Sequence, residues 1–231
     1  MRRGRRAYYD NFSRFYDRFV ALHSRDRRGV AREFLVDRVA VSNGGSVLDL
    51  CTGTATLLSW LQAKVGPDGR VVGVDFSHGM LKVAQEKTRN FANVYLVEAD
   101  AGCLPFATGA FDAVTCSHAF YELKGETQDR ALQEIVRVLR PNGAFLMMEH
   151  DVPANLLVRA LFYLRLTFIG AGRAITFLRH EQEVLARYFG SVAKFVAPAG
   201  RSKVMICQKF GTIRRDSSQD QHYPTQHHTT V

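Results

Sequence analysis

Apolar residues form two kinds of pattern along the chain, and the two alternate. Short, mostly apolar runs are typical of buried strands, and longer segments with apolar residues three or four apart are typical of helices. The strand-type runs cover residues 46–50, 70–75, 94–98, 111–116 and 144–149. The helix-type segments cover residues 56–65, 77–90 and 126–139. Connections of this length do not close hairpins, so the pattern predicts parallel strands in an α/β fold.

Further elements are expected on both sides of this alternating body. Helices are predicted near residues 8–23 and 27–41, before the first strand. After Pro153, two largely apolar helices separated by a glycine turn indicate an inserted cap, and residues 192–197 and 203–210 are expected to pair as the last two strands. The tail from Gly211 has too little apolar content to fold, so we expect it to be disordered.

Composition supports a folded domain in a reducing compartment. The chain has 231 residues, of which 46% are hydrophobic and 23% are charged, close to the usage of a globular protein. Its four cysteines form no CxxC motif, which favours buried thiols in a cytosol over disulfides or zinc. We see no export signal, and arginines interrupt the apolar stretch 155–178, which argues against a membrane span. We therefore expect a cytoplasmic protein.

Positive charge is concentrated at the N-terminus. The net charge is +9, and residues 1–32 hold ten arginines against three aspartates. Such an arm could meet nucleic acid or an anionic membrane, including peripheral contact at the inner membrane face. On charge alone, a solvated helix surface is the favoured interpretation.

The segment that follows the first strand predicts a binding site for a small molecule. Residues 47–56 end a buried strand in small residues and open a helix, and ligands bind at such edges of parallel sheets. A dinucleotide fingerprint would need glycine at Cys51, Gly53 and Thr56, and only Gly53 complies. Asp75 lies 22 residues after Gly53, the spacing of a carboxylate that binds a ribose diol. The pattern disfavours NAD and favours another ligand that contains a nucleoside.

At this point the chain resembles a known family. Four segments in order are similar to class I S-adenosylmethionine-dependent methyltransferases, of the type 11 group that includes the ubiquinone and menaquinone biosynthesis methyltransferases. They are residues 47–55, 72–81, 97–106, and 111–123 continuing into 135–149. The resemblance implies a Rossmann-like, mostly parallel seven-stranded sheet in the order 3-2-1-4-5-7-6, with helices on both faces and a small helical cap. It divides the chain into a basic arm (1–42), a methyltransferase domain (43–210, cap at about 153–180) and the tail (211–231).

The resemblance also implies S-adenosyl-L-methionine as the cofactor and a set of residues that bind it. These are Asp49, Cys51, Gly53, Asp75, Phe76, Asp100, Ala101 and Ser117. The first three would line the methionine end, and Asp75 would bind the ribose hydroxyls. Phe76 would flank the adenine, Asp100 would bind its amino group with help from the backbone of Ala101, and Ser117 would sit beside the transferable methyl. Ala55 departs from the pattern, because the family has glycine there. A positive φ at Ala55 would cost about 1 kcal/mol.

Methyl transfer requires alignment of the reactants, and a general base only if the acceptor is protonated. The candidates for that base are His118, Tyr121 and Glu122 after the fourth strand and Glu149, His150 and Asp151 after the fifth. Of these, we favour His118, Tyr121 and His150. A lone histidine is more often structural than catalytic, so both roles stay open for His118 and His150. The spacing of histidines and carboxylates matches no known metal site, so we expect no metal.

The acceptor is the least determined part of the prediction. The cap has more apolar residues than one buried stripe needs, and these either complete the core or line a site for a lipophilic acceptor. A quinone precursor is our leading acceptor, and a phospholipid amine is the alternative. A protein that binds the cofactor without transferring methyl is a third hypothesis. Nucleic acid is not expected, because Ser117-His118-Ala119-Phe120 stands where a base methyltransferase would have (Asp/Asn)-Pro-Pro-(Tyr/Phe).

Overall fold

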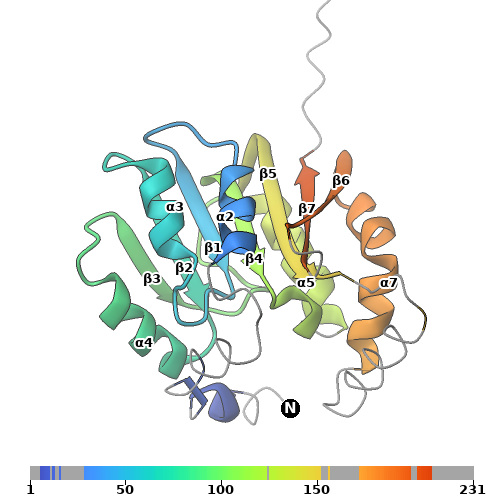
Figure 1. Cartoon of the computed structure of the whole chain (residues 1–231), viewed down its shortest axis with the longest axis horizontal. Coiled ribbons are helices and arrows are strands. Elements are labelled where there is room, and N and C mark those ends of the chain that lie inside the picture. The colour runs from blue at the N-terminus through green and yellow to red at the C-terminus, as the bar shows by residue number, and fades with distance from the viewer. Residues whose placement is uncertain are drawn as a thin grey trace, which may run out of the picture.

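A single twisted sheet organises the protein in the computed structural model (Figure 1). The structure describes residues 6–10, 12–13, 16, 29–123, 125–151, 156, 172–198 and 202–209. The sheet has seven strands in the order β3-β2-β1-β4-β5-β7-β6, as predicted. They are β1 (Ser46–Leu50), β2 (Arg70–Asp75), β3 (Val94–Glu98), β4 (Phe111–Ser117), β5 (Leu139–His150), β6 (Ser191–Val196) and β7 (Ser202–Gln208).

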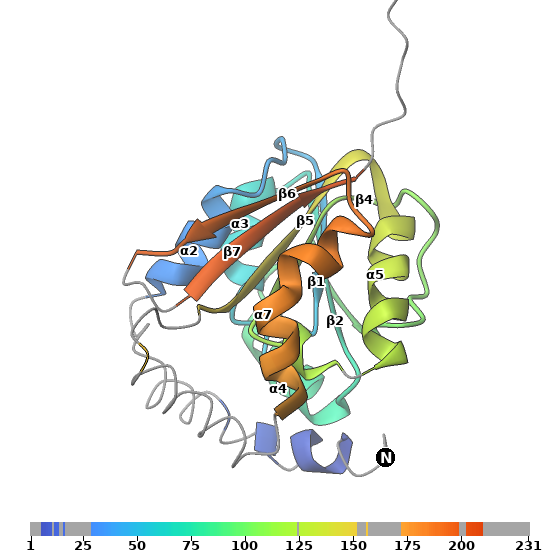
Figure 2. The ribbon, with the colours of Figure 1, turned by 90° about the vertical axis from the view of Figure 1, so that its right-hand side faces the viewer.

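Helices connect the strands and cover both faces of the sheet. They are α2 (Val30–Asp37), α3 (Leu58–Val65), α4 (His78–Thr88), the 3-10 turn η1 (Phe120–Glu122), α5 (Glu126–Val138) and α7 (Gly172–Ala186). Strands β1 to β5 run parallel, and β7 is antiparallel to both β5 and β6. Figures 1 and 2 show α2, α3 and α4 on one face and α5 and α7 on the other.

Each face of the sheet has its own hydrophobic core, because neighbouring strand residues point to opposite sides. Val47 packs in the cluster that contains Leu35 of α2 and Leu61 of α3. Leu48 packs in the other cluster, with Ile135 of α5 and with residues of α7. All five residues of β1 are buried, which explains why this central strand is an almost continuous apolar run.

Most predicted boundaries agree with the structure to within one or two residues, but α2 is shorter than the helix predicted near 27–41 and β5 starts earlier than predicted. The sequence predicts a turn at 140–143 and a strand from 144. The strand instead begins at Leu139, which pairs with Phe111, and the register then shifts before Ala113 pairs with Ala144. Asn142 has φ 70 within this irregular stretch. The turn residues therefore form a bulged extension of the strand.

Ser77 is predicted to cap the helix after the second strand, and the structure confirms this. Its hydroxyl oxygen accepts a hydrogen bond from the backbone N–H of Met80 at 3.2 Å, and α4 begins at the next residue. The cap satisfies one of the donors that the first helical turn leaves without a partner. It fixes where α4 starts relative to the end of β2.

Several predictions concern residues outside the described part of the chain. These are most of the helix at 8–23, the first cap helix at 155–168 and the tail at 211–231. The second cap helix is described, as α7. Within the described ranges, no helix is both long and apolar enough to cross a membrane.

An ion pair is buried between α7 and β7. The ammonium of Lys203 contacts a carboxylate oxygen of Glu181, and the two residues are 1% and 5% exposed. A buried pair of this kind contributes little net stability, because both charges lose their hydration. Removing one partner is costly, since the other is then buried without compensation.

We predict that Lys203→Met destabilises the protein by about 3 kcal/mol. The double variant Lys203→Met/Glu181→Met should recover most of this loss, because no buried charge remains. Urea denaturation of the two variants and the wild type measures the difference. A double variant that is less stable than the single one would show that the pair is itself strongly stabilising.

Candidate functional site

The carboxyl ends of the parallel strands meet at one edge of the sheet. Leu50 is paired with Val74 of β2 and with Cys116 of β4, and Asp75 is paired with Glu98 at the end of β3. The loops that follow these strands therefore lie beside one another. The residues for which a cofactor or catalytic role is predicted lie in these loops, in the last residues of the strands before them, and at the end of β5.

Asp49 lies at the centre of a buried hydrogen-bond network on this edge. Its two carboxylate oxygens accept hydrogen bonds from the hydroxyls of Thr52 and Thr115, both at 2.7 Å. Asp49 is 2% exposed, and burial raises its pKa to about 6. The two threonine hydrogen bonds act in the opposite direction, and the nearby charge of Asp75 adds to the increase. Above pH 6 Asp49 is therefore ionised, and its buried charge then lowers the stability of the folded protein.

Asp75 joins the loops after β1 and β2. One carboxylate oxygen accepts a hydrogen bond from the backbone N–H of Gly53 and the other from that of Ser77, each at 2.9 Å. Burial raises the pKa of Asp75, although these backbone donors lower it. A carboxylate oxygen has two lone pairs, so each can accept a further hydrogen bond, as a ribose hydroxyl would provide.

The loop after β1 has an unusual backbone. Cys51, Gly53 and Ala55 have φ values of 56, 55 and 63, so every second residue is left-handed. The positive φ considered for Ala55 is present, and its side chain is buried. A Cβ built on Gly53 would meet nothing within 4 Å, so the chain leaves space there. Such backbone strain is typical of ligand sites.

The residues predicted to hold an adenine lie after β2 and β3. Phe76 follows Asp75 directly, and the ring of Tyr9 meets its ring edge-on at 5.7 Å. Asp100 pairs with Cys103 in a short bridge and accepts a hydrogen bond from the N–H of Gly102 at 3.0 Å. Ala101, between them in the chain, is buried. The structure thus brings these residues to the same edge as Asp75.

Two of the candidate bases face each other at the ends of β4 and β5. The rings of His118 and His150 lie 4.6 Å apart, and the Tyr121 ring lies 6.0 Å from that of His150. His118 follows Ser117 with φ 52, and its buried Nδ1 has no hydrogen-bond partner among the described residues. Burial, with smaller effects of His150 and Arg32, holds the pKa of His118 well below its usual value. Its imidazole is therefore neutral at pH 7, whereas burial raises the pKa of Tyr121 and keeps its phenol protonated.

Glu149 holds the turn that carries Tyr121. One of its carboxyl oxygens accepts hydrogen bonds from the N–H groups of Phe120 at 2.9 Å and Tyr121 at 3.2 Å. Glu149 is fully buried, and burial raises its pKa well above the usual range. The sequence names Glu149 only as a candidate base, beside His150, and does not predict this structural role. Only the three-dimensional structure shows that Glu149 fixes η1 against the end of β5.

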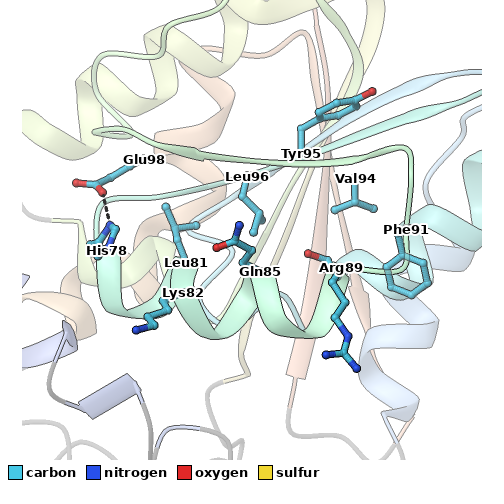
Figure 3. A pocket seen from close by; sticks show the side chains of 11 residues that line it. His78, Leu81, Lys82, Gln85, Arg89, Phe91, Val94, Tyr95, Leu96 and Glu98 are labelled. Carbon is cyan, nitrogen blue, oxygen red and sulfur yellow. Dashed lines mark hydrogen bonds and ion pairs between the residues drawn. The ribbon is translucent and has the colours of Figure 1, made fainter.

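An open groove of about 650 Å³ lies between α4 and β3, and Figure 3 shows the side chains that line it. It is lined by apolar side chains such as Leu81 and by polar ones such as Gln85, and at one end His78 bonds to Glu98 at 3.1 Å. None of the predicted cofactor or catalytic residues lines this groove. Within the described part of the chain, no group of three or more histidine, cysteine or acidic side chains could hold a metal ion.

Solved structures define the class of fold. A SAM dependent methyltransferase from Aquifex aeolicus superposes with a TM-score of 0.59 over 83% of this chain and 97% of that one, at 18% identity. The architecture is therefore the Rossmann-like fold of the class I methyltransferases. The ubiE/COQ5 methyltransferase family matches residues 5–172, and the chain belongs to this family. The resemblance stated from the sequence is confirmed.

Curated relatives match more than half of the chain. The Demethylmenaquinone methyltransferase of Staphylococcus carnosus (strain TM300) is 38% identical over 145 residues, which are 63% of this chain and 59% of that protein. The enzyme of the same name from Staphylococcus epidermidis (strain ATCC 12228 / FDA PCI 1200) is 34% identical over 161 residues, 70% and 66% of the two chains. This chain thus spans roughly three fifths to two thirds of the length of these relatives.

The raised pKa of Asp49 predicts a specific pH dependence of stability. Since its pKa rises from 3.8 to about 6 on folding, its stabilising effect is complete below pH 4 and is lost as pH rises through 6. We expect Asp49→Asn to gain stability over the wild type between pH 4 and pH 8, by about 3 kcal/mol at most. Urea denaturation at both pH values measures the gain. An equal difference at the two pH values would contradict the assignment.

Proposed function

We propose that this protein transfers a methyl group from S-adenosyl-L-methionine to a lipophilic small molecule, with a quinone precursor as the acceptor. The observation that carries the proposal is the edge built by Asp49, Gly53 and Asp75 in a chain of the ubiE/COQ5 methyltransferase family. The relatives that match are named for demethylmenaquinone, which supports a quinone acceptor over a phospholipid amine.

The residues of this edge fit the cofactor. The open space above Gly53 would admit the amino-acid end, beside the carboxyl of Asp49. Asp75 already accepts two backbone donors and has lone pairs for the ribose hydroxyls. Phe76 would flank the adenine, with Asp100 and Ala101 at its edge, and Ser117 and Cys51 would border the methyl group.

When bound, the cofactor supplies a methyl group already activated by a sulfonium, so the chain's own task is to orient the acceptor and remove a proton. His118 is the residue we assign to that task. Its imidazole is neutral, its Nδ1 has no hydrogen-bond partner among the residues that the structure describes, and it follows the strand that ends beside the cofactor edge. His150 and Tyr121 would border the acceptor, and Glu149 would hold Tyr121 in place.

The cofactor assignment predicts different effects for two glycines with similar backbone. Gly53 and Gly44 have φ 55 and 84, and an added Cβ meets nothing within 4 Å at either position. Gly53→Ala and Gly44→Ala should each lose about 1 kcal/mol of stability, because alanine is strained at positive φ. Only Gly53→Ala should weaken S-adenosyl-L-methionine binding in calorimetry, by tenfold or more, since Gly44 precedes β1 at the opposite edge. Equal affinities of the two variants would place the cofactor elsewhere.

The acceptor assignment is tested with a demethylated menaquinol and S-adenosyl-L-methionine carrying a ¹³C methyl group. We expect the label on a ring carbon of the quinone, and none on phosphatidylethanolamine offered in its place. His118→Gln should lower kcat by about 10²- to 10⁴-fold without changing cofactor affinity, as expected for loss of a general base.

Other outcomes of this assay identify the alternatives. Labelled phosphatidylethanolamine would indicate the lipid amine, and tight cofactor binding without turnover on any acceptor would indicate a binding protein. The strained backbone at Ala55 favours the binding protein, so the Ala55→Gly variant is included in this assay.

A further inference from the structure

A short turn from the basic N-terminus lies across the predicted cofactor edge. In Figures 1 and 2 the dark-blue helical turn formed by residues 6–10 sits at the end of the sheet where α4 begins. We call residues 6–10 the docked turn. Its side chains reach the carboxyl-end side of three strands. Arg6 pairs with Glu98, the last residue of β3, and the hydroxyl of Tyr9 donates to Glu122, which follows β4.

The third contact, made by Asp10, is to the start of α4. Its Oδ1 accepts hydrogen bonds from the hydroxyl of Ser77 at 2.6 Å and from the N–H of Gly79 at 2.9 Å. Ser77 is also the residue whose own N–H is bound by Asp75. Ser77 thus links the carboxylate of Asp10 to that of Asp75, which is proposed to bind the ribose.

The backbone of Asp10 lies directly against Gly79. A Cβ at this position would lie 2.6 Å from the Cα and carbonyl oxygen of Asp10, a distance that backbone atoms cannot accommodate. Gly79 is not among the glycines with positive φ, so its conformation does not require glycine. Within α4, glycine is also a poorer helix former than alanine. The close approach of the docked turn is therefore the physical reason for glycine here.

Tyr9 connects this contact to the cofactor. The Asp10 hydrogen bonds fix the end of the docked turn, and the adjacent Tyr9 then packs edge-on against Phe76. Phe76 is the residue proposed to flank the adenine. Burial works to raise the pKa of Asp10, but the donors Ser77 and Gly79 and the charge of Arg6 outweigh it, so its pKa is lowered. The carboxylate is therefore charged at neutral pH.

We propose that Asp10, seated on Gly79, is a positioning residue that holds Tyr9 against Phe76 and makes the docked turn a wall of the adenosine site. This inference rests on the proposed function, because it assigns the ligand that the wall encloses. It gives the N-terminus a role within the site, distinct from contact with a membrane or with nucleic acid.

Calorimetry of the full chain with S-adenosyl-L-methionine tests the proposal. Asp10→Ala and Gly79→Ala should each raise Kd about tenfold, the first by removing the acceptor and the second by displacing the turn. Asp10→Asn keeps an acceptor oxygen, so it should stay within about threefold of the wild type. Glu86→Ala, on the exposed side of α4, is the matched control and should leave Kd unchanged.

Hydrogen exchange supplies a readout that a merely structural role would not move. Because coupling is reciprocal, S-adenosyl-L-methionine should slow exchange of the amides of residues 6–10 in the wild type and not in Asp10→Ala. Unchanged Kd in both Asp10→Ala and Gly79→Ala, or cofactor that does not protect these amides, overturns the proposal while the proposed function stands. A wild type that does not bind the cofactor overturns both.

Discussion

The carboxylate of Asp75 is the contact on which the organisation of this edge depends. It binds the backbone of Gly53 and of Ser77, so the loops after β1 and β2 cannot move independently. Ser77 in turn caps α4 and donates to Asp10. One buried acid therefore links the strained glycine loop, the start of a helix and the N-terminal turn. Its burial opposes its charge, and this cost is met only because backbone donors converge on it.

The central strands could be predicted from the sequence because they are buried on both faces. Buried parallel strands are continuous apolar runs, and turn residues mark their ends, so the bounds of β1 and β2 coincide with the prediction. The bounds of β3 also coincide, although this strand at the edge of the sheet is only partly buried. The start of β5 could not be predicted in this way. Pro141 and Gly143 are typical turn residues, and only the pairing of Leu139 with Phe111 makes the segment a bulged strand.

The site was only partly predictable for a similar reason. Motifs identify residues that lie at the ends of strands, and they place Asp49 and Asp75 at one edge correctly. They do not report contacts between distant segments. In the sequence, Asp10 is one acidic residue among arginines, and Gly79 is one residue of a predicted helix. Their 2.9 Å hydrogen bond, across 69 positions of the chain, exists only in the folded protein.

The sheet order has a consequence for how such a protein diversifies. With β1 in the interior, the loops after β1, β2 and β3 collect on one side, and those after β4 and β5, with α7, collect on the other. The first group shares the Asp75 contacts, whereas the second is tied together by Glu149. In the proposed function, the first group holds most of the cofactor residues and the second carries the candidate acceptor residues. Substitutions in the second group would therefore change the range of acceptors more than the binding of the methyl donor.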